Sequence, residues 1–189
     1  TSLKYGLNRY EYTATIDFSS INNGKLVEED IYDLFLRLNF HDRSEEKDVR
    51  IGRPAFRARH FIKETSAAQD NQVAIVSPYY TFKASNLSLE VYAYDKETFD
   101  FLQGKLRFAW FHRFMNKRKN VWIVGERPYK AQDTGYHFFK FMRENHPEKN
   151  VYYVIEEDSP ERRNVDPLGN VLFFKSKEHI WQTLISTRV

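Results

Sequence analysis

A run of charged and polar side chains between residues 126 and 134 is the part of the sequence best suited to bind a polar ligand. It follows a short apolar segment, residues 121–124, which ends at Gly125. Arg127 and Lys130 of this run could hold a phosphate group, because their side chains can donate charge-assisted hydrogen bonds to its oxygens. The N-terminus of a following helix would add its partial positive charge. The residues expected to face the ligand are Glu126, Arg127, Lys130, Gln132 and Asp133.

A purely structural interpretation of the same loop is equally open. Glu126 and Arg127 could pair with each other or with the preceding part of the chain, and Pro128 would then simply end the strand. Asp133 and Thr134 are candidates for the N-cap of the next helix, since both residue types accept hydrogen bonds from the first helical N–H groups. The loop matches neither G-x-G-x-x-G nor G-x-x-x-x-G-K, so no motif supports nucleotide binding.

The histidines and acidic residues do not form a recognisable catalytic or metal-binding pattern. His137, His146 and His179 flank or enter predicted helices, and no two of them have the i, i+4 spacing of a helical metal site. Asp133 and His137 have that spacing as a mixed pair, which a surface pair explains as well as catalysis does. Residues 156–158 are acidic and could meet a hydroxyl or a cation, or form a solvated loop. We therefore assign no catalytic residue, metal or cofactor.

The elements that would position these side chains form a βαβ unit. Residues 121–124 are typical of a buried strand, residues 136–142 have helical periodicity, and residues 151–155 form a second β-rich run. This order within about 35 residues indicates a parallel sheet, in which ligands bind at the carboxyl ends of the strands. Residues 171–174 predict a third strand, and Ser176 is a candidate N-cap for another helix. Together they make an incomplete Rossmann-like α/β lobe, so we expect a fragment of a larger domain.

The first half of the chain, residues 1–96, has the pattern of a separate β domain. Alternating apolar and polar residues indicate half-buried strands, and residues 22–24 form a turn because Asn and Gly tolerate positive φ. Strands about ten residues apart predict an antiparallel, Ig-like β-sandwich that binds or positions rather than catalyses. The candidate strands are residues 12–18, 31–40, 49–51, 58–62, 72–76, 79–83 and 87–94.

Residues 97–119 predict a basic, aromatic linker helix between this domain and the lobe of residues 120–189. Leu102, Leu106, Trp110 and Phe114 recur every four residues, and further aromatic residues widen the apolar face beyond an ordinary core stripe. The helix could pack between two domains, or it could lie in a membrane interface with its cations on anionic lipid. Both could hold at once. The residues expected to face a membrane are Lys105, Arg107, Trp110, Phe111, Arg113, Phe114, Lys117 and Arg118.

Composition limits the class of protein. A hydrophobic content of 41% with 16% aromatic residues supports a globular core. The net charge of +3 is a small difference between 29 basic and 26 acidic residues, and no nucleic-acid-binding motif accompanies it, so we expect no nucleic-acid partner. The chain lacks Cys, which excludes disulfides and Cys-ligated metals. No apolar run reaches the ~20 residues needed to span a bilayer.

Several separated blocks in the second half of the chain resemble a known family. Residues 119–147, 151–155, 168–171 and 176–179 begin Lys-Asn-Val-Trp, Val-Tyr-Tyr-Val, Leu-Gly-Asn-Val and Ser-Lys-Glu-His. Residues 117–189 are thereby similar to the amino-terminal part of the CDP-glycerol glycerophosphotransferases, the teichoic-acid and capsule polymerases of bacteria. The β-rich segment and the basic helix resemble, more loosely, the accessory module and linker that precede this part in some members.

The resemblance implies a GT-B-type enzyme with two Rossmann-like halves. It would transfer glycerol or ribitol phosphate from a CDP-alditol donor to a lipid-linked polymer at the cytoplasmic face of the bacterial membrane. In the family, the amino-terminal half faces the acceptor and the carboxy-terminal half holds the donor. The family's catalytic histidines lie in downstream motifs that do not include His137, His146 or His179.

We therefore expect an acceptor-side fragment that is peripheral on the inner face of the membrane and inactive alone. The alternative is a non-catalytic binding module that docks on a membrane surface or a partner protein.

Overall fold

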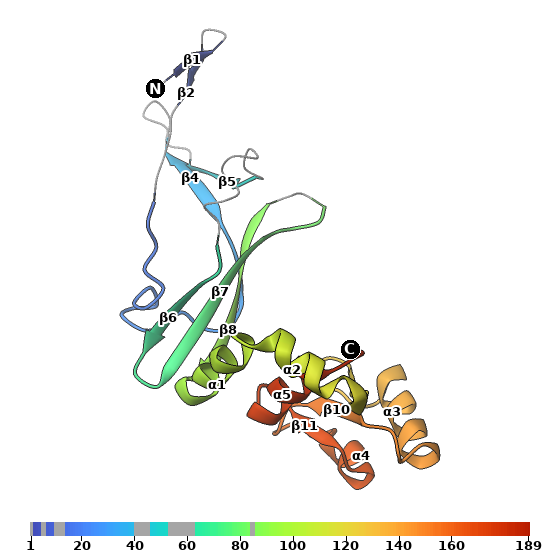
Figure 1. The fold of residues 1–189 in the computed structure, drawn as a ribbon. Helices are drawn as coiled ribbons and strands as arrows, with labels where there is room; N and C mark the ends of the chain where they lie inside the picture. Colours follow the sequence, from blue (N-terminus) through green and yellow to red (C-terminus); the bar gives the residue numbers. More distant parts are fainter. Residues whose placement is uncertain (1, 5–6, 10–13, 40–45, 53–62, 84–85) are drawn as a thin grey trace. The chain divides into compact units, whose positions relative to one another are not determined.

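The computed structural model describes residues 2–4, 7–9, 14–39, 46–52, 63–83 and 86–189. The chain divides into two compact units, Thr1–Tyr94 and Asp95–Val189. Antiparallel sheets make up the first unit, and a parallel sheet flanked by helices makes up the second (Figure 1). The predicted combination of α and β structure, with both kinds of sheet, is confirmed.

The first unit is built on a four-stranded sheet in the order β3–β8–β7–β6. β3 pairs antiparallel with β8, and β6 with β7. Val27 packs with alternate residues of β7 and β8 on the sheet, and this cluster is the core of the unit. The four strands are β3 (Ile31–Asp33), β6 (Thr65–Gln69), β7 (Gln72–Tyr80) and β8 (Leu87–Asp95).

Two short hairpins complete the described part of this unit. β1 (Ser2–Lys4) pairs with β2 (Leu7–Arg9), and β4 (Phe35–Asn39) pairs with β5 (Glu46–Arg50). The hairpin β4–β5 and the four-stranded sheet are separate sheets. Antiparallel structure is therefore confirmed, whereas the Ig-like sandwich is not confirmed by the described residues.

Two strand predictions in the first unit differ from the structure, one wholly and one in part. Residues 14–17 are not a strand. At their end, the Asp17 carboxylate accepts hydrogen bonds from the Ser19 N–H at 2.9 Å and the Ser20 Oγ at 2.9 Å. These bonds fold residues 17–20 into a turn. The strand predicted over residues 31–40 is interrupted at Leu34, between β3 and β4.

Further predictions for this unit can be compared with the strands and the turn that the structure shows. Residues 72–80 form one strand and not two, because Pro78 lies beyond the last pair with β6, Thr65 with Val76. Its missing N–H therefore breaks no bond of that pairing. The turn at residues 22–24 is confirmed, with positive φ at Asn23 and Gly24. Residues 12–13 and 58–62 lie outside the described residues.

The second unit contains a parallel sheet in the order β11–β10–β9. β9 (Trp122–Gly125), β10 (Val151–Ile155) and β11 (Val171–Phe173) all run in the same direction. The predicted adjacency of residues 121–124 and 151–155 is thus confirmed. Arg188 pairs in parallel with Trp122, and its carbonyl accepts the Ile123 N–H at 2.9 Å.

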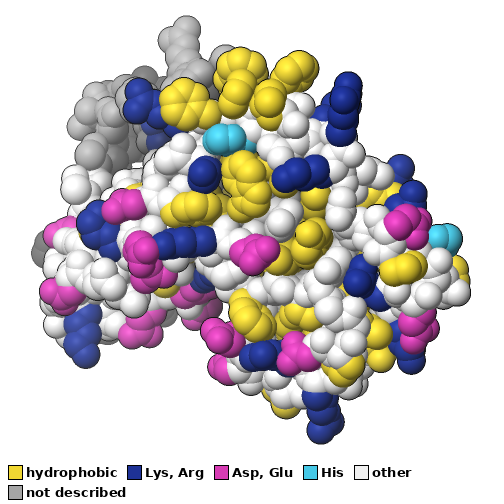
Figure 2. Space-filling view, turned by 60° about the horizontal axis from the view of Figure 1, so that its bottom comes forward, with side chains coloured by type: hydrophobic (Ala, Val, Ile, Leu, Met, Phe, Trp, Pro, Cys, Tyr) yellow, Lys and Arg dark blue, Asp and Glu magenta, His cyan; other side chains and the backbone are white. Residues whose placement is uncertain are grey.

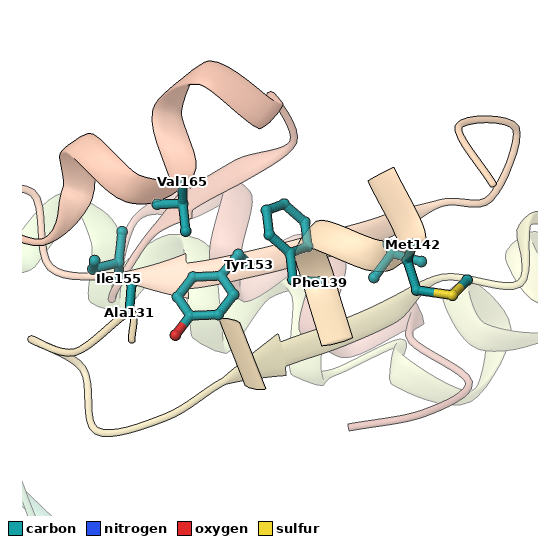
Figure 3. Packing of buried hydrophobic residues seen from close by; sticks show 7 residues of the cluster. Ala131, Phe139, Met142, Tyr153, Ile155 and Val165 are labelled. Carbon is teal, nitrogen blue, oxygen red and sulfur yellow. The ribbon is translucent and has the colours of Figure 1, made fainter. Parts of the chain in front are cut away.

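Helices cover both faces of this sheet. On one face, Tyr153 packs with Phe139 of α3 (Thr134–Asn145) and Val165 of α4 (Arg162–Val165), as Figure 3 shows. On the other face, Val154 and Val121 pack with Ile185 of α5 (Lys177–Ile185). Successive strand residues point to opposite faces, so a strand covered on both sides is apolar throughout.

The segment predicted as one basic helix forms three pieces. They are α1 (Lys96–Leu106), α2 (Ala109–Asn116) and the 3-10 turn η2 (Lys117–Lys119). The break lies at Phe108, whose φ of −121° and ψ of 28° are not helical. Both α1 and α2 contact α5, and Lys177 forms an ion pair with Glu97. Among the described residues, no helix is long and apolar enough to cross a membrane.

The acidic segment after β10 is also more ordered than the sequence predicts. It contains α4 and the 3-10 turn η3 (Asp166–Leu168). Elements of three or four residues are too short to give a periodic apolar pattern, so the sequence does not predict them.

Candidate functional site

The polar edge of the parallel sheet is where its three strands end together. Gly125 pairs with Val154, and Ile155 pairs with Phe173, so the last residues of the strands are in register. The loops that leave this edge comprise residues 126–133 after β9, residues 156–161 after β10 and residues 174–176 after β11. The structure thus brings the predicted loop to a carboxyl edge, the usual ligand side of a parallel sheet.

Glu126 caps the N-terminus of α3. Its carboxylate accepts the backbone N–H of Asp133 at 3.0 Å and that of Tyr136 at 2.9 Å, with a longer contact of 3.4 Å to the N–H of Gln132. A carboxylate at this position is stabilised by the N–H groups and by the positive end of the helix dipole. The helix N-terminus expected to help bind a phosphate is therefore already occupied by a side chain of the loop.

The close approach of Glu126 to α3 depends on Gly135. A Cβ added there would lie 3.1 Å from Glu126 Cγ and 3.1 Å from the carbonyl oxygen of Gly125. Asp133 is at the N-cap position, but its side chain makes no capping hydrogen bond. Asp133 is therefore the N-cap residue that the sequence predicted, but the capping hydrogen bonds go to Glu126, which accepts from the N–H groups of Asp133 and Tyr136, seven and ten residues away along the chain.

Arg127 and Lys130 lie on the same turn, without acidic partners. The Lys130 N–H donates to the Arg127 carbonyl at 2.7 Å, and the Arg127 guanidinium donates to the Tyr129 hydroxyl at 3.2 Å. Within the described residues, neither side chain has a carboxylate at ion-pair distance. The alternative ion pair between Glu126 and Arg127 is not formed. Gln132 is exposed beside them.

β10 and the segment that follows it hold this loop in place through hydrogen bonds. The Tyr153 hydroxyl donates to the Lys130 carbonyl at 2.8 Å, and Ser159 Oγ donates to the Tyr129 carbonyl at 2.8 Å. Glu161 accepts the Ala131 N–H through its carboxylate. Burial raises the pKa of Tyr153, and nearby carboxylates add to this, so the phenol stays a donor. These supporting residues have no signal in the sequence, since they meet the loop only in the folded sheet.

His179 is held in a polar arrangement at the β11–α5 junction. The backbone N–H of His179 donates to Ser176 Oγ at 3.1 Å, which confirms Ser176 as the N-cap of α5. Its Nδ1 accepts the Lys175 N–H at 3.0 Å, and burial lowers its pKa. His137 is exposed next to Tyr136. Across the residues that the structure describes, no cluster of three potential metal ligands occurs.

The residues expected to face a membrane gather mainly on α2 and η2. Trp110 is 73% exposed and Phe114 is 72% exposed, although both are large apolar side chains. Lys105 differs, because its ammonium group lies over the ring of Trp181 at 5.1 Å and it packs on α5. Figure 2 shows hydrophobic side chains with Lys and Arg side chains around them on one face. The exposed members of the predicted set are Arg107, Trp110, Phe111, Arg113, Phe114, Lys117 and Arg118.

Two comparisons with known proteins relate the chain to teichoic acid synthesis. Residues 1–91 match the family described as TarS beta-glycosyltransferase C-terminal domain 1. The chain is also 32% identical over 72 residues to the minor teichoic acid biosynthesis protein GgaB of Bacillus subtilis (strain 168). That alignment covers 38% of this chain and 8% of GgaB. No solved structure matches the chain. The two matches support a teichoic acid polymerase family, as the resemblance in the sequence predicted.

Replacing Glu126 tests its capping role. We expect Glu126→Ala to lower the free energy of unfolding of the second unit by about 1–2 kcal/mol, because the N–H groups of Gln132, Asp133 and Tyr136 lose their acceptor and the helix dipole loses its anion. Asp133→Ala is the matched control and should change it by less than ~0.5 kcal/mol. Hydrogen exchange at the amides of α3 measures both. Equal effects of the two substitutions would contradict the assignment.

The buried His179 predicts a dependence of stability on pH. Its pKa is lower in the folded protein than in the unfolded chain, so the unfolded chain binds the proton more tightly. The buried, neutral His179 therefore makes its full contribution to the free energy of unfolding above the unfolded pKa of about 6.5. That contribution is lost as the pH falls toward the pKa of the folded protein. We expect His179→Asn, which keeps an acceptor, to flatten the stability curve of the second unit in this window. Parallel curves for both proteins in urea titrations would refute it.

Proposed function

We propose that this chain, whose matches support a teichoic acid polymerase family, supplies the acceptor-side part of an enzyme that builds a cell-wall polymer. The reaction would be transfer of glycerol phosphate or ribitol phosphate from a CDP-alditol to the end of a lipid-linked teichoic-acid-like or capsular chain. The chain aligns with only 8% of the length of GgaB. A donor-binding half and the catalytic residues would lie in another part of the complete enzyme.

The position of β9 is the observation that carries this proposal. β9 has β10 on one side, and on the other Arg188 begins a parallel pairing. A doubly wound Rossmann-like sheet reverses its strand order at such a position, and ligands bind outside the carboxyl ends of the strands there. The loop with Arg127 and Lys130 leaves β9 at that end. A GT-B-type architecture would place the second half of the enzyme across this edge.

In this proposal the residues of the loop have different roles. Arg127 and Lys130 hold phosphate groups of the acceptor polymer, because both are cations without a carboxylate partner among the described residues. Glu126 positions them by joining the loop to α3. Gln132 and Asp133 lie beside them as exposed polar groups that can meet acceptor hydroxyls. No catalytic residue, metal or cofactor is assigned to this chain.

A second role is favoured by the exposed aromatic face of α2. Trp110, Phe111 and Phe114 would enter the headgroup region of the cytoplasmic leaflet, with neighbouring Arg and Lys side chains on anionic lipid. The sequence from residue 101 to 125 contains no Asp or Glu, so no acidic residue of this stretch would repel such a surface. The enzyme would then be peripheral on the membrane that carries its acceptor. The first unit would be a non-catalytic accessory module.

Replacing Arg127 tests the acceptor site. In the complete enzyme, supplied with a CDP-alditol and a lipid-linked acceptor, Arg127→Ala should lower kcat/KM for the acceptor roughly 10- to 150-fold, the equivalent of one lost charged hydrogen bond. Lys149→Ala is the control, because Lys149 precedes β10 at the opposite edge of the sheet. Unchanged polymer synthesis by Arg127→Ala would remove the residue from the site. Absence of transfer from both CDP-glycerol and CDP-ribitol would refute the reaction itself.

Vesicle flotation tests the membrane role. We expect the chain to float with vesicles of phosphatidylcholine and phosphatidylglycerol, and to do so less as salt is raised. Trp110→Ser should weaken partitioning about 10-fold through loss of buried aromatic area. Phe141→Ser is the matched control, since Phe141 on α3 is also exposed, at 54%. Equal flotation with neutral vesicles, or equal loss in both variants, would count against an interfacial α2.

A further inference from the structure

Tyr129 is an exposed aromatic residue of the loop after β9 that contributes neither to the cap of α3 nor to the core of the second unit. Its side chain is 46% exposed, whereas Phe139 and Tyr153 of the same unit are fully buried. The loop leaves the carboxyl edge of the parallel sheet, where such sheets bind their ligands. The contacts of Tyr129 therefore indicate which ligand this edge suits.

The backbone that carries Tyr129 is held by a hydrogen bond to each carbonyl from residue 127 to residue 131. The Lys130 N–H donates to the Arg127 carbonyl at 2.7 Å and closes a β-turn, in which Pro128 has the second position that Pro favours. The carbonyls of residues 128–131 accept from β10 and the segment after it. Their donors are, in order, the Glu156 N–H at 2.6 Å, Ser159 Oγ at 2.8 Å, the Tyr153 hydroxyl at 2.8 Å and Asn164 Nδ2 at 2.9 Å. The protein thus engages the carbonyls of the turn and leaves its side chains to meet a ligand.

Arg127 and Tyr129 contact each other through their polar ends. Arg127 Nη1 donates to the Tyr129 hydroxyl oxygen at 3.2 Å. A phenol also has a hydrogen of its own to donate, and an arginine has five N–H donors. In the described part of the chain, no acceptor takes the Tyr129 hydrogen, and no carboxylate lies at ion-pair distance from Arg127. The pair therefore presents one O–H and several N–H donors at the same place.

Donors grouped in this way, beside an exposed ring, suit a phosphate ester. Guanidinium N–H groups and a phenol O–H both make short, charge-assisted hydrogen bonds to anionic oxygens. The Tyr129 ring adds an apolar surface, and a Tyr ring gives contact area with little loss of conformational entropy. A ligand that uses both parts has a phosphate joined to a chain of carbon atoms. A bare phosphate would use the donors alone.

We propose that Tyr129 binds a phosphodiester-linked polyol unit, with its hydroxyl on the phosphate beside Arg127 and its ring on the carbon chain. The proposal deepens the proposed function and rests on it for the identification of this unit with the end of the acceptor polymer. Tyr129 would then distinguish a polyol phosphate from other phosphates. Arg127 and Lys130 do not make this distinction by themselves, because they recognise the charge.

Binding of two small phosphodiesters to the 189-residue chain tests this assignment without a transfer reaction. Glycerophosphoglycerol and dimethyl phosphate both carry one negative charge at neutral pH, and only the first has polyol chains. NMR titrations that follow the tyrosine ring and arginine side-chain signals measure both dissociation constants. We expect glycerophosphoglycerol to bind about 5-fold more tightly, because its longer carbon chains cover more of the Tyr129 ring.

Substitutions at Tyr129 separate its hydroxyl from its ring. Tyr129→Phe should weaken the binding of both diesters about 10-fold, because it removes one charge-assisted hydrogen bond and keeps the ring. Tyr129→Ala should in addition abolish the preference for glycerophosphoglycerol. Tyr79→Phe is the matched control, since Tyr79 of β7 is an exposed tyrosine of the first unit. In an Arg127→Ala background, Tyr129→Phe should still weaken binding, which a role limited to orienting Arg127 would not produce.

The other outcomes overturn the proposal in defined ways. Equal binding of the two diesters to the unaltered chain would refute contact with the ring. Equal effects of Tyr129→Phe and Tyr79→Phe would remove the hydroxyl from the phosphate. Loss of the Tyr129→Phe effect in the Arg127→Ala background would show that Tyr129 only positions Arg127. Selective binding of glycerophosphoglycerol, with no transfer from a CDP-alditol by the complete enzyme, would refute the proposed function and leave the Tyr129 site standing.

Discussion

The hydrogen bonds from the N–H groups of Asp133 and Tyr136, at the start of α3, to the Glu126 carboxylate determine the shape of the polar edge of the sheet. They close residues 126–133 into a loop whose two ends are fixed, one by β9 and one by α3. Gly135 permits this contact, because a Cβ there would press on Glu126 and on the Gly125 carbonyl. With the helix N-terminus neutralised from within the protein, attraction of an anion to this loop falls to Arg127 and Lys130.

The same loop is rigid because the sheet beneath it is covered on both faces. Tyr153 packs with Phe139 in the buried core and still reaches the Lys130 carbonyl with its hydroxyl. One side chain thus joins the apolar core to the polar edge, and such a core resists the movement that would release it. These bonds fix the backbone that carries Arg127 and Lys130, so less backbone entropy is lost if the loop binds a ligand.

In α1 and α2 of the second unit, by contrast, large apolar side chains remain exposed. α1 and α2 use one face to pack on α5, where His112 meets Trp181 at 5.1 Å, and leave Trp110 and Phe114 in solvent. Exposed aromatic side chains lack the stabilisation that burial gives, so a contiguous set of them marks a surface that another apolar phase covers. The interfacial role proposed for α2 would make the membrane that phase.

The sequence by itself determined the elements whose pattern is local. The parallel pairing of residues 121–124 with 151–155, the Ser176 cap and the turn at residues 22–24 all followed from periodicity and turn chemistry. It also located the loop after β9 and the exposed aromatic and cationic side chains of α2. The tertiary structure alone decided that Glu126 makes the capping hydrogen bond that Asp133, at the N-cap position of α3, does not make, that Lys105 packs on Trp181, and that Tyr153 supports the loop after β9. The reason is physical: each of these contacts joins atoms brought together only when the strands align and the helices pack, and spacing along the chain carries no record of such distances.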